Sequence, residues 1–224
     1  MIQRSAAMVF APGAWVFPGG RVDQGDIELA AATLPASADI DDHAARIAAI
    51  RETIEEVGIA VGLDPLPPSD AVSAIRVALH AGGSFADLLA RFRLRLVPGS
   101  LLSFSRWQPP ENAPRRFDTR FYIARAHEAT TASVDGAEAV ASRWTTADDM
   151  LAQSDARILF PTMCNLRRIA TQRCFADLAA HAAAFPSSLI AAEVRDIAGK
   201  RHLCVPDGHG YPRIRVPLTD VFRG

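Results

Sequence analysis

One stretch decides how this 224-residue chain folds: R-E-T-I-E-E-V-G-I, residues 51–59. At about 100° per helical residue, Glu52, Glu55 and Glu56 share a face roughly 100° wide. Aliphatic side chains occupy the opposite face, at positions 47, 50, 54 and 57. Three crowded carboxylates repel one another, whereas a hard divalent cation such as Mg²⁺ prefers oxygen ligands and leaves room for substrate phosphates. We interpret the acidic face as metal-binding; the alternative is an ordinary solvated face.

The flanking residues predict where this helix begins and ends. Either Asp41 or Asp42 is a suitable N-cap, and the helix is expected to run to about Val57. Gly58 follows, where a left-handed residue commonly ends a helix. Three alanines flank the acidic face, at positions 45, 48 and 49, so another backbone can approach closely there.

A second stretch, W-V-F-P-G-G at residues 15–20, ends a short apolar run with two glycines. A double glycine lets the backbone turn sharply and present carbonyls or amides to an ion or a phosphate. The alternative is a simple turn. Occurring with the acidic helix, the pair favours a phosphate- or metal-binding loop.

Together, the two stretches resemble the ends of the nudix box, G-x5-E-x7-R-E-U-x-E-E-x-G-U, where U is a bulky aliphatic residue. The second half matches in order, with Thr53 in place of one aliphatic residue. The first half departs, because 31 positions separate Gly20 from Arg51 where the box has 14, so 17 residues are inserted. The box glutamate, which in the family supports the structure through the motif arginine, is also missing. Its replacement is left open between three nearby residues: Asp26, Asp42 and His43.

The interrupted box resembles one nudix branch, that of the peroxisomal coenzyme A diphosphatase and its bacterial relatives. That branch has F-P-G-G followed by spaced aspartates, here Asp23 and Asp26, and then a variable insertion. Further shared segments are W-x-x-P at residues 107–110, R-R-F-D-T-R-F at residues 115–121 and F-P-T at residues 160–162. The separate coenzyme A signature of other nudix coenzyme A hydrolases is absent.

The resemblance implies an α/β fold, the nudix α/β/α sandwich with a mixed β-sheet and inserted helices. It also implies hydrolysis of a diphosphate linkage in a nucleoside-diphosphate derivative, with Mg²⁺ or Mn²⁺ as the cofactor. Catalysis is assigned to Glu52, as metal ligand or general base, and to Arg51, which orients the carboxylates. The predicted metal ligands are Glu52, Glu55, Glu56, the Gly20 carbonyl and Glu138, and the predicted substrate-binding residues are Gly19, Arg21, Arg116 and Arg120.

Two of these assignments have plain alternatives. Glu138 lies where many nudix enzymes carry another carboxylate near the metals. The alternative is that Glu138 is an ordinary solvated loop glutamate, which the sequence does not distinguish. Guanidinium groups at Arg115, Arg116 and Arg120 suit phosphates, although charges at strand ends also favour solubility.

The expected substrate is coenzyme A or an acyl-coenzyme A, by likeness to the branch. Two other functions remain open: a diphosphatase of ADP-ribose or nucleotide sugars, and a nudix-fold sensor that binds a nucleotide without turnover. Retention of all four residues of the Arg51-Glu52 and Glu55-Glu56 pairs argues against the sensor. A small-molecule nucleotide is the expected partner, and a homodimer is possible.

The composition excludes other classes of function. Hydrophobic residues are 49% and the net charge is −1, so the chain is globular and lacks the basic footprint of a nucleic-acid or anionic-membrane binder. No apolar run is long enough for a membrane helix. Three cysteines without metal-binding spacing predict reduced thiols in a cytoplasmic protein.

We expect a single nudix domain over residues 1–224, with insertions at about 26–40 and 62–95. Residues 26–40 read as irregular or weakly helical, and 162–184 as one long helix. Short strands are expected at 8–10 and 142–144. Because the family sheet begins before the Ala-Pro-Gly turn at residues 11–13, we also expect an upstream extension, a swapped strand or a missing strand.

Overall fold

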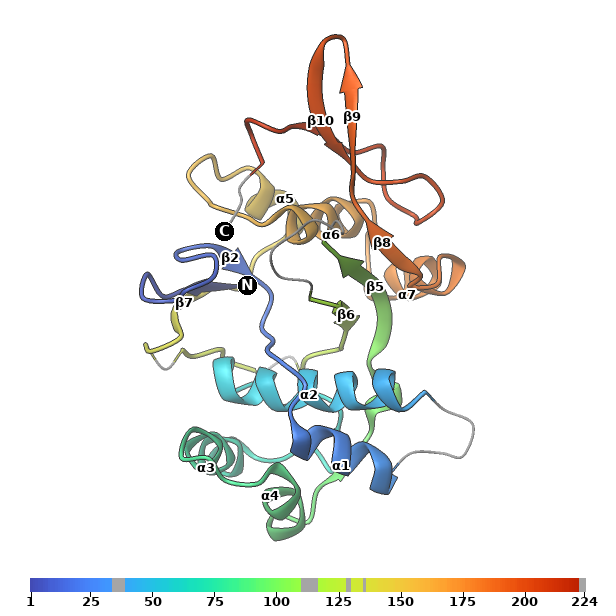
Figure 1. Ribbon diagram of the computed structural model, residues 1–224. Coiled ribbons are helices and arrows are strands. Elements are labelled where there is room, and N and C mark those ends of the chain that lie inside the picture. Colours follow the sequence, from blue (N-terminus) through green and yellow to red (C-terminus); the bar gives the residue numbers. More distant parts are fainter. Residues whose placement is uncertain (34–38, 110–116, 128–129, 135, 222–224) are drawn as a thin grey trace. The chain divides into compact units, whose positions relative to one another are not determined.

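The computed structural model describes residues 1–33, 39–109, 117–127, 130–134 and 136–221 (Figure 1). The chain divides into two compact units, and each is described by itself. Unit 1 comprises Met1–Ser5, Phe17–Leu101 and Ala124–Arg143. Unit 2 comprises Ala6–Val16, Leu102–Ile123 and Trp144–Gly224. The prediction of a single domain stays a prediction.

The described part of unit 1 contains four helices. They are α1 (Gln24–Thr33), α2 (Ile40–Val57), α3 (Ser69–His80) and α4 (Phe85–Arg91). Helix α2 contacts α1 and α3, and helix α4 also contacts α1 and α3 (Figure 1). The predicted insertions therefore supply α1, α3 and α4 around the acidic helix.

Helix α2 carries the acidic stretch, and its apolar face is buried as predicted. Ile47, Ile50 and Ile54 are completely buried. The helix begins two or three residues earlier than expected, because Asp39, rather than Asp41 or Asp42, is its N-cap: the Asp39 side chain accepts the Asp41 N–H at 2.9 Å.

Of the two expectations for residues 26–40, irregular or weakly helical, the structure shows a helix, α1, in the part that it describes. Asp23 and Asp26 form a reciprocal capping box. The Asp26 N–H donates to the Asp23 carboxylate at 2.8 Å, and the Asp23 N–H donates to the Asp26 carboxylate at 3.0 Å. The second acidic position of such a box is usually Glu or Gln, so two aspartates hid the signal. Residues 34–38, the rest of the predicted insertion, lie outside the described residues.

Unit 1 also contains short strands. Strand β1 (Ile2–Arg4) pairs antiparallel with β7 (Ala139–Ser142), and β3 (Leu63–Asp64) pairs with β4 (Arg95–Leu96) before the 3-10 turn η1 (Pro98–Ser100). The strand expected at residues 8–10 is wrong, since the extended segment is β1, nearer the N-terminus, where β7 is its hydrogen-bonding partner. The strand expected at 142–144 starts and ends earlier. The expectation of an upstream extension, a swapped strand or a missing strand stays a prediction.

Unit 2 contains a mixed sheet in which β5 (Leu102–Gln108) pairs antiparallel with β6 (Thr119–Ile123) and parallel with β8 (Leu189–Ala191). Its remaining elements are β2 (Trp15–Val16), α5 (Ala147–Leu151), α6 (Phe160–Ala170), α7 (Phe175–Ala184), β9 (Glu193–Ile197), β10 (Lys200–Cys204) and β11 (Arg215–Pro217). The single helix expected at 162–184 is therefore two helices. The Thr171 hydroxyl donates to the Arg168 carbonyl at 2.8 Å and occupies an acceptor in the last turn of α6.

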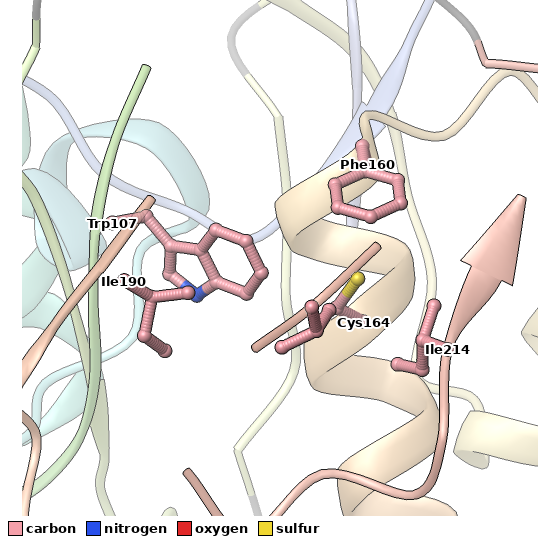
Figure 2. Close-up of a cluster of buried hydrophobic side chains, with 6 residues drawn as sticks. Trp107, Phe160, Cys164, Ile190 and Ile214 are labelled. Atoms are coloured by element: carbon pink, nitrogen blue, oxygen red, sulfur yellow. The ribbon is translucent and has the colours of Figure 1, made fainter. Parts of the chain in front are cut away.

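The hydrophobic core of unit 2 joins its sheet to α6 (Figure 2). The indole of Trp107 meets Phe160 edge-on at 6.1 Å, and its Nε1–H donates to the Tyr211 hydroxyl at 3.2 Å. Four further side chains complete this core: Cys164, Ile190, Val205 and Ile214. The aromatic residue of the W-x-x-P segment is therefore a core residue of this unit.

The cysteines are free, as expected. Cys164 and Cys204 are buried and Cys174 is exposed. Burial raises the pKa of the Cys164 thiol. Over the described ranges, the structure contains no helix with the length and apolar character needed to cross a membrane.

The approach of Gly62 to α2 gives a test of this packing. Gly62 has φ +62°, and a methyl group there would lie 2.9 Å from both the Ile50 Cγ1 and the Leu101 Cδ1. Gly82 has φ +79° but has open space around it. We expect Gly62→Ala to lower the free energy of unfolding by about 2–4 kcal/mol, from backbone strain plus overpacking, and Gly82→Ala by only about 1 kcal/mol. Urea denaturation of both variants measures the difference, and equal losses would contradict the proposed close packing.

Candidate active site

Arg51 lies at the centre of the site and is 8% exposed. Its Nε and Nη2 donate to the two carboxylate oxygens of Asp26 at 3.1 and 2.9 Å. Asp26 itself is 1% exposed. This bidentate pair fixes the guanidinium plane and joins α1 to α2.

The same guanidinium also contacts the acidic face. Its Nη1 donates to Glu52 at 2.9 Å and to Glu55 at 3.2 Å, while Nη2 donates to the Arg21 carbonyl at 3.0 Å. Burial alone would lower the pKa of Arg51, but the hydrogen bond to Asp26 and the charges of Glu52 and Asp26 raise it above its ordinary value. Arg51 is therefore a permanent cation that ties the segment after the two glycines to two carboxylates of α2.

The structure shows which residue occupies the place of the missing box glutamate. Asp42 pairs with Arg46 at 2.6 Å on the same helix, and the His43 imidazole lies 3.2 Å from the Thr33 hydroxyl. Among these candidates, Asp26 is the one that contacts Arg51.

Glu56 is held by the first glycine of the pair. The Gly19 N–H donates to the Glu56 Oε2 at 2.7 Å, and Gly19 adopts φ +153°, which side-chain-bearing residues rarely adopt. Glu56 is 7% exposed. Burial raises its pKa to about 8; repulsion from Glu52 adds to the rise, and the hydrogen bond from Gly19 opposes it. The fold therefore buries a carboxylate whose charge is not fully compensated.

Gly20 packs against Glu52. A methyl group at this position would collide with the Glu52 carboxylate, so glycine is required by the close approach of the backbone. Burial raises the pKa of Glu52, and the charge of Arg51 works against that rise. The predicted metal residues Gly20, Glu52, Glu55 and Glu56 are thus brought together around one end of α2.

Two residues in or next to the paired strands β1 and β7 also act on Glu56. Glu138, which immediately precedes β7, is close enough for its charge to raise the pKa of Glu56, and Arg4 of β1 lowers it. Glu138 was predicted here; Arg4 was not, because a lone arginine near the N-terminus carries no motif. Only the pairing of β1 with β7 brings these two residues near each other.

The predicted substrate-binding residues fall into three groups. Gly19 and Arg21 lie in unit 1, where the Gly19 amide holds Glu56 and the exposed Arg21 offers its carbonyl to Arg51. Arg120 lies on β6 of unit 2, with its Nη2 3.7 Å from Asp118, which also receives two hydrogen bonds from Arg106. Arg116, with Arg115, lies outside the described residues. Their substrate roles stay predictions.

Comparison with known proteins supports the motif. No family model matches the chain. In an alignment 231 residues long, it is 26% identical to the acyl-coenzyme A diphosphatase NUDT19 of Homo sapiens, and the alignment covers 80% of this chain and 62% of that protein. It is 30% identical over 127 residues to nudix hydrolase 7 of Caenorhabditis elegans, covering 55% of this chain and 38% of that protein. The chain thus spans less than two thirds of either relative's length.

The fold comparison agrees. A nudix hydrolase crystal structure from Alicyclobacillus acidocaldarius matches with a TM-score of 0.65 at 29% identity, covering 76% of this chain and 82% of that one. The chain therefore resembles nudix hydrolases in both sequence and fold. The predicted α/β nudix fold and the resemblance to the coenzyme A diphosphatase branch are confirmed. The chemical roles of the site residues stay predictions.

Nudix hydrolases use divalent metal ions, so we asked whether these residues fit one. Within the described ranges, no three His, Cys, Asp or Glu side chains already form a ready-made metal cluster. The donor chemistry nevertheless fits, because Glu52, Glu55 and Glu56 offer only carboxylate oxygens, which suit Mg²⁺ or Mn²⁺. The raised pKa values of the partly buried Glu52 and the buried Glu56 show that this environment penalises uncompensated negative charge. A cation bound there would remove that penalty.

The buried pair of Arg51 and Asp26 can be tested by substitution. We expect Asp26→Asn to lower the free energy of unfolding by about 3 kcal/mol, because it leaves the buried guanidinium short of negative charge. Asp42→Asn is the matched control, since its partly exposed pair with Arg46 is expected to contribute no more than about 0.5 kcal/mol. Chemical denaturation measures both. A loss for Asp26→Asn no larger than that of the control would show that the pair does not hold the site together.

Proposed function

We propose that this nudix protein hydrolyses a diphosphate linkage in a nucleoside-diphosphate derivative with the help of Mg²⁺ or Mn²⁺. The observation that carries the proposal is the gathering of Glu52, Glu55 and Glu56 on α2 around Arg51, with Gly19 and Gly20 packed against two of them. Such an arrangement has little value for stability alone, since it crowds like charges.

Each residue has a distinct part in this proposal. Glu52, Glu55, Glu56 and the Gly20 carbonyl would hold the cation, and Glu138 adds negative charge near Glu56. A bound divalent cation supplies Lewis-acid chemistry, since it polarises phosphoryl oxygens and acidifies bound water. Arg51 orients Glu52 and Glu55 through its two Nη1 hydrogen bonds. The raised pKa of Glu52 suits a carboxylate that accepts a proton from the attacking water.

Substrate choice depends on groups outside the diphosphate, because carboxylates and cation treat every diphosphate alike. We propose coenzyme A or an acyl-coenzyme A as the substrate, cleaved to 3′,5′-ADP and a phosphopantetheine. The support is the W-x-x-P and R-R-F-D-T-R-F segments together with the similarity to NUDT19, a protein named as an acyl-coenzyme A diphosphatase. We further propose that the protein acts in the cytoplasm, in keeping with its free cysteines.

Metal-dependent catalysis is tested on the acidic helix. We expect Glu55→Gln and Glu56→Gln each to lower kcat by about 100-fold or more, because each removes an anionic oxygen from the transition-state environment. Glu28→Gln is the control, since Glu28 is an exposed carboxylate on α1. Product formation with Mg²⁺ and after exhaustive chelation is measured by mass spectrometry. Wild-type activity that survives chelation would overturn the metal-dependent mechanism.

The substrate proposal has its own measurement. We expect kcat/KM for coenzyme A or a short acyl-coenzyme A to exceed that for ADP-ribose by at least about tenfold, or roughly 1.4 kcal/mol of transition-state binding. Side-by-side steady-state kinetics at saturating Mg²⁺ provide the ratio. An equal or reversed preference would remove the coenzyme A assignment and leave diphosphate hydrolysis in place.

A further inference from the structure

Helix α3, part of an insertion, brings one arginine to the C-terminal end of α2. The Arg76 Nε donates to the Glu55 carbonyl at 2.8 Å, and its Nη2 donates to the Glu56 carbonyl at 2.9 Å. These are the backbone groups of two predicted metal ligands. Four residues further along α3, the His80 Nδ1 lies 3.9 Å from the Glu55 carboxylate, so the same helix also faces that side chain.

The end of α2 explains why these contacts matter. The last four carbonyls of a helix have no partner within it. Here the Gly58 N–H donates to the Ile54 carbonyl at 2.9 Å, and the Ser133 N–H donates to the Val57 carbonyl at 3.0 Å. Arg76 takes the two that remain, which belong to Glu55 and Glu56.

A second contact fixes the guanidinium itself. The Arg76 Nη1 donates to the Ser133 hydroxyl at 2.8 Å, so the side chain that caps α2 is also bound to the segment that receives the Val57 carbonyl. Three directional hydrogen bonds define the plane of the group. Its positive charge also lies where a helix terminus carries partial negative charge.

We propose that Arg76 is a positioning residue that fixes the last turn of α2 and thereby the direction in which Glu55 and Glu56 present their carboxylates. This inference rests on the metal site of the proposed function. It gives the insertion a role in aligning metal ligands. Because neighbouring carboxylates repel one another, a frayed last turn would let them separate, whereas a capped turn holds them together.

The test is direct binding of Mn²⁺, followed by electron paramagnetic resonance of the free ion, alongside thermal unfolding. We expect Arg76→Met to bind Mn²⁺ about tenfold more weakly than the wild type, the loss typical of removing a group that orients a metal ligand. Arg76→Lys keeps the charge but cannot span both carbonyls, so its affinity is expected to fall between the two. Arg91→Met, at the exposed end of α4, is the matched control and should bind within about twofold of wild type.

Each outcome decides the proposal. A lowered Tm with unchanged Mn²⁺ affinity in Arg76→Met would reduce Arg76 to a structural cap and overturn it, and so would a wild type that binds no Mn²⁺. If the wild type binds Mn²⁺ but cleaves no diphosphate, the proposed function fails while weaker binding by Arg76→Met still supports positioning. Should Arg76→Met not fold, Ser133→Ala takes its place; about two- to threefold weaker binding supports the proposal, and unchanged binding overturns it.

Discussion

The buried guanidinium of Arg51 is the constraint on which unit 1 depends. A charge removed from water must be paired, and Asp26 provides both of its oxygens for that purpose. Satisfying this pair fixes α1 against α2, and the remaining donors of Arg51 then reach Glu52, Glu55 and the Arg21 carbonyl. The 17 residues inserted into the motif are tolerated because what Arg51 requires is a carboxylate in reach, not a particular spacing along the chain.

Stability and chemistry make opposite demands on the acidic face. Stability favours few buried like charges, yet Glu52 and Glu56 are both placed where burial raises their pKa values. The fold offsets part of this cost locally, through Arg51 beside Glu52 and the Gly19 amide on Glu56. In the proposed function, a bound cation would compensate the negative charge that these contacts leave, and its binding would offset the cost of burying Glu56.

Local signals decided how much of this could be predicted from the sequence. Helix α2 was predicted nearly to its ends because its apolar period and Gly58 act within a few residues of each other. Helix α1 was predicted only as an irregular or weakly helical segment, because its capping box uses two aspartates and its faces differ little in polarity. The choice of Asp26 over Asp42 or His43 needed the tertiary packing of α1 on α2. Arg4 and Arg76 were beyond sequence reasoning for the same reason, since each reaches the site from another element.

The acidic helix is restrained at both ends and at Arg51, and these contacts hold in place the face that carries its three carboxylates. Asp39 caps its first turn, and Arg51 binds Asp26 from its third quarter. At the other end, Arg76 and Ser133 take the carbonyls that Gly58 leaves open. Repulsion between the glutamates favours rotating or unwinding the helix, and these contacts oppose such motions. The insertions therefore do more than extend the motif: through α1 and α3 they supply the restraints that its charge requires.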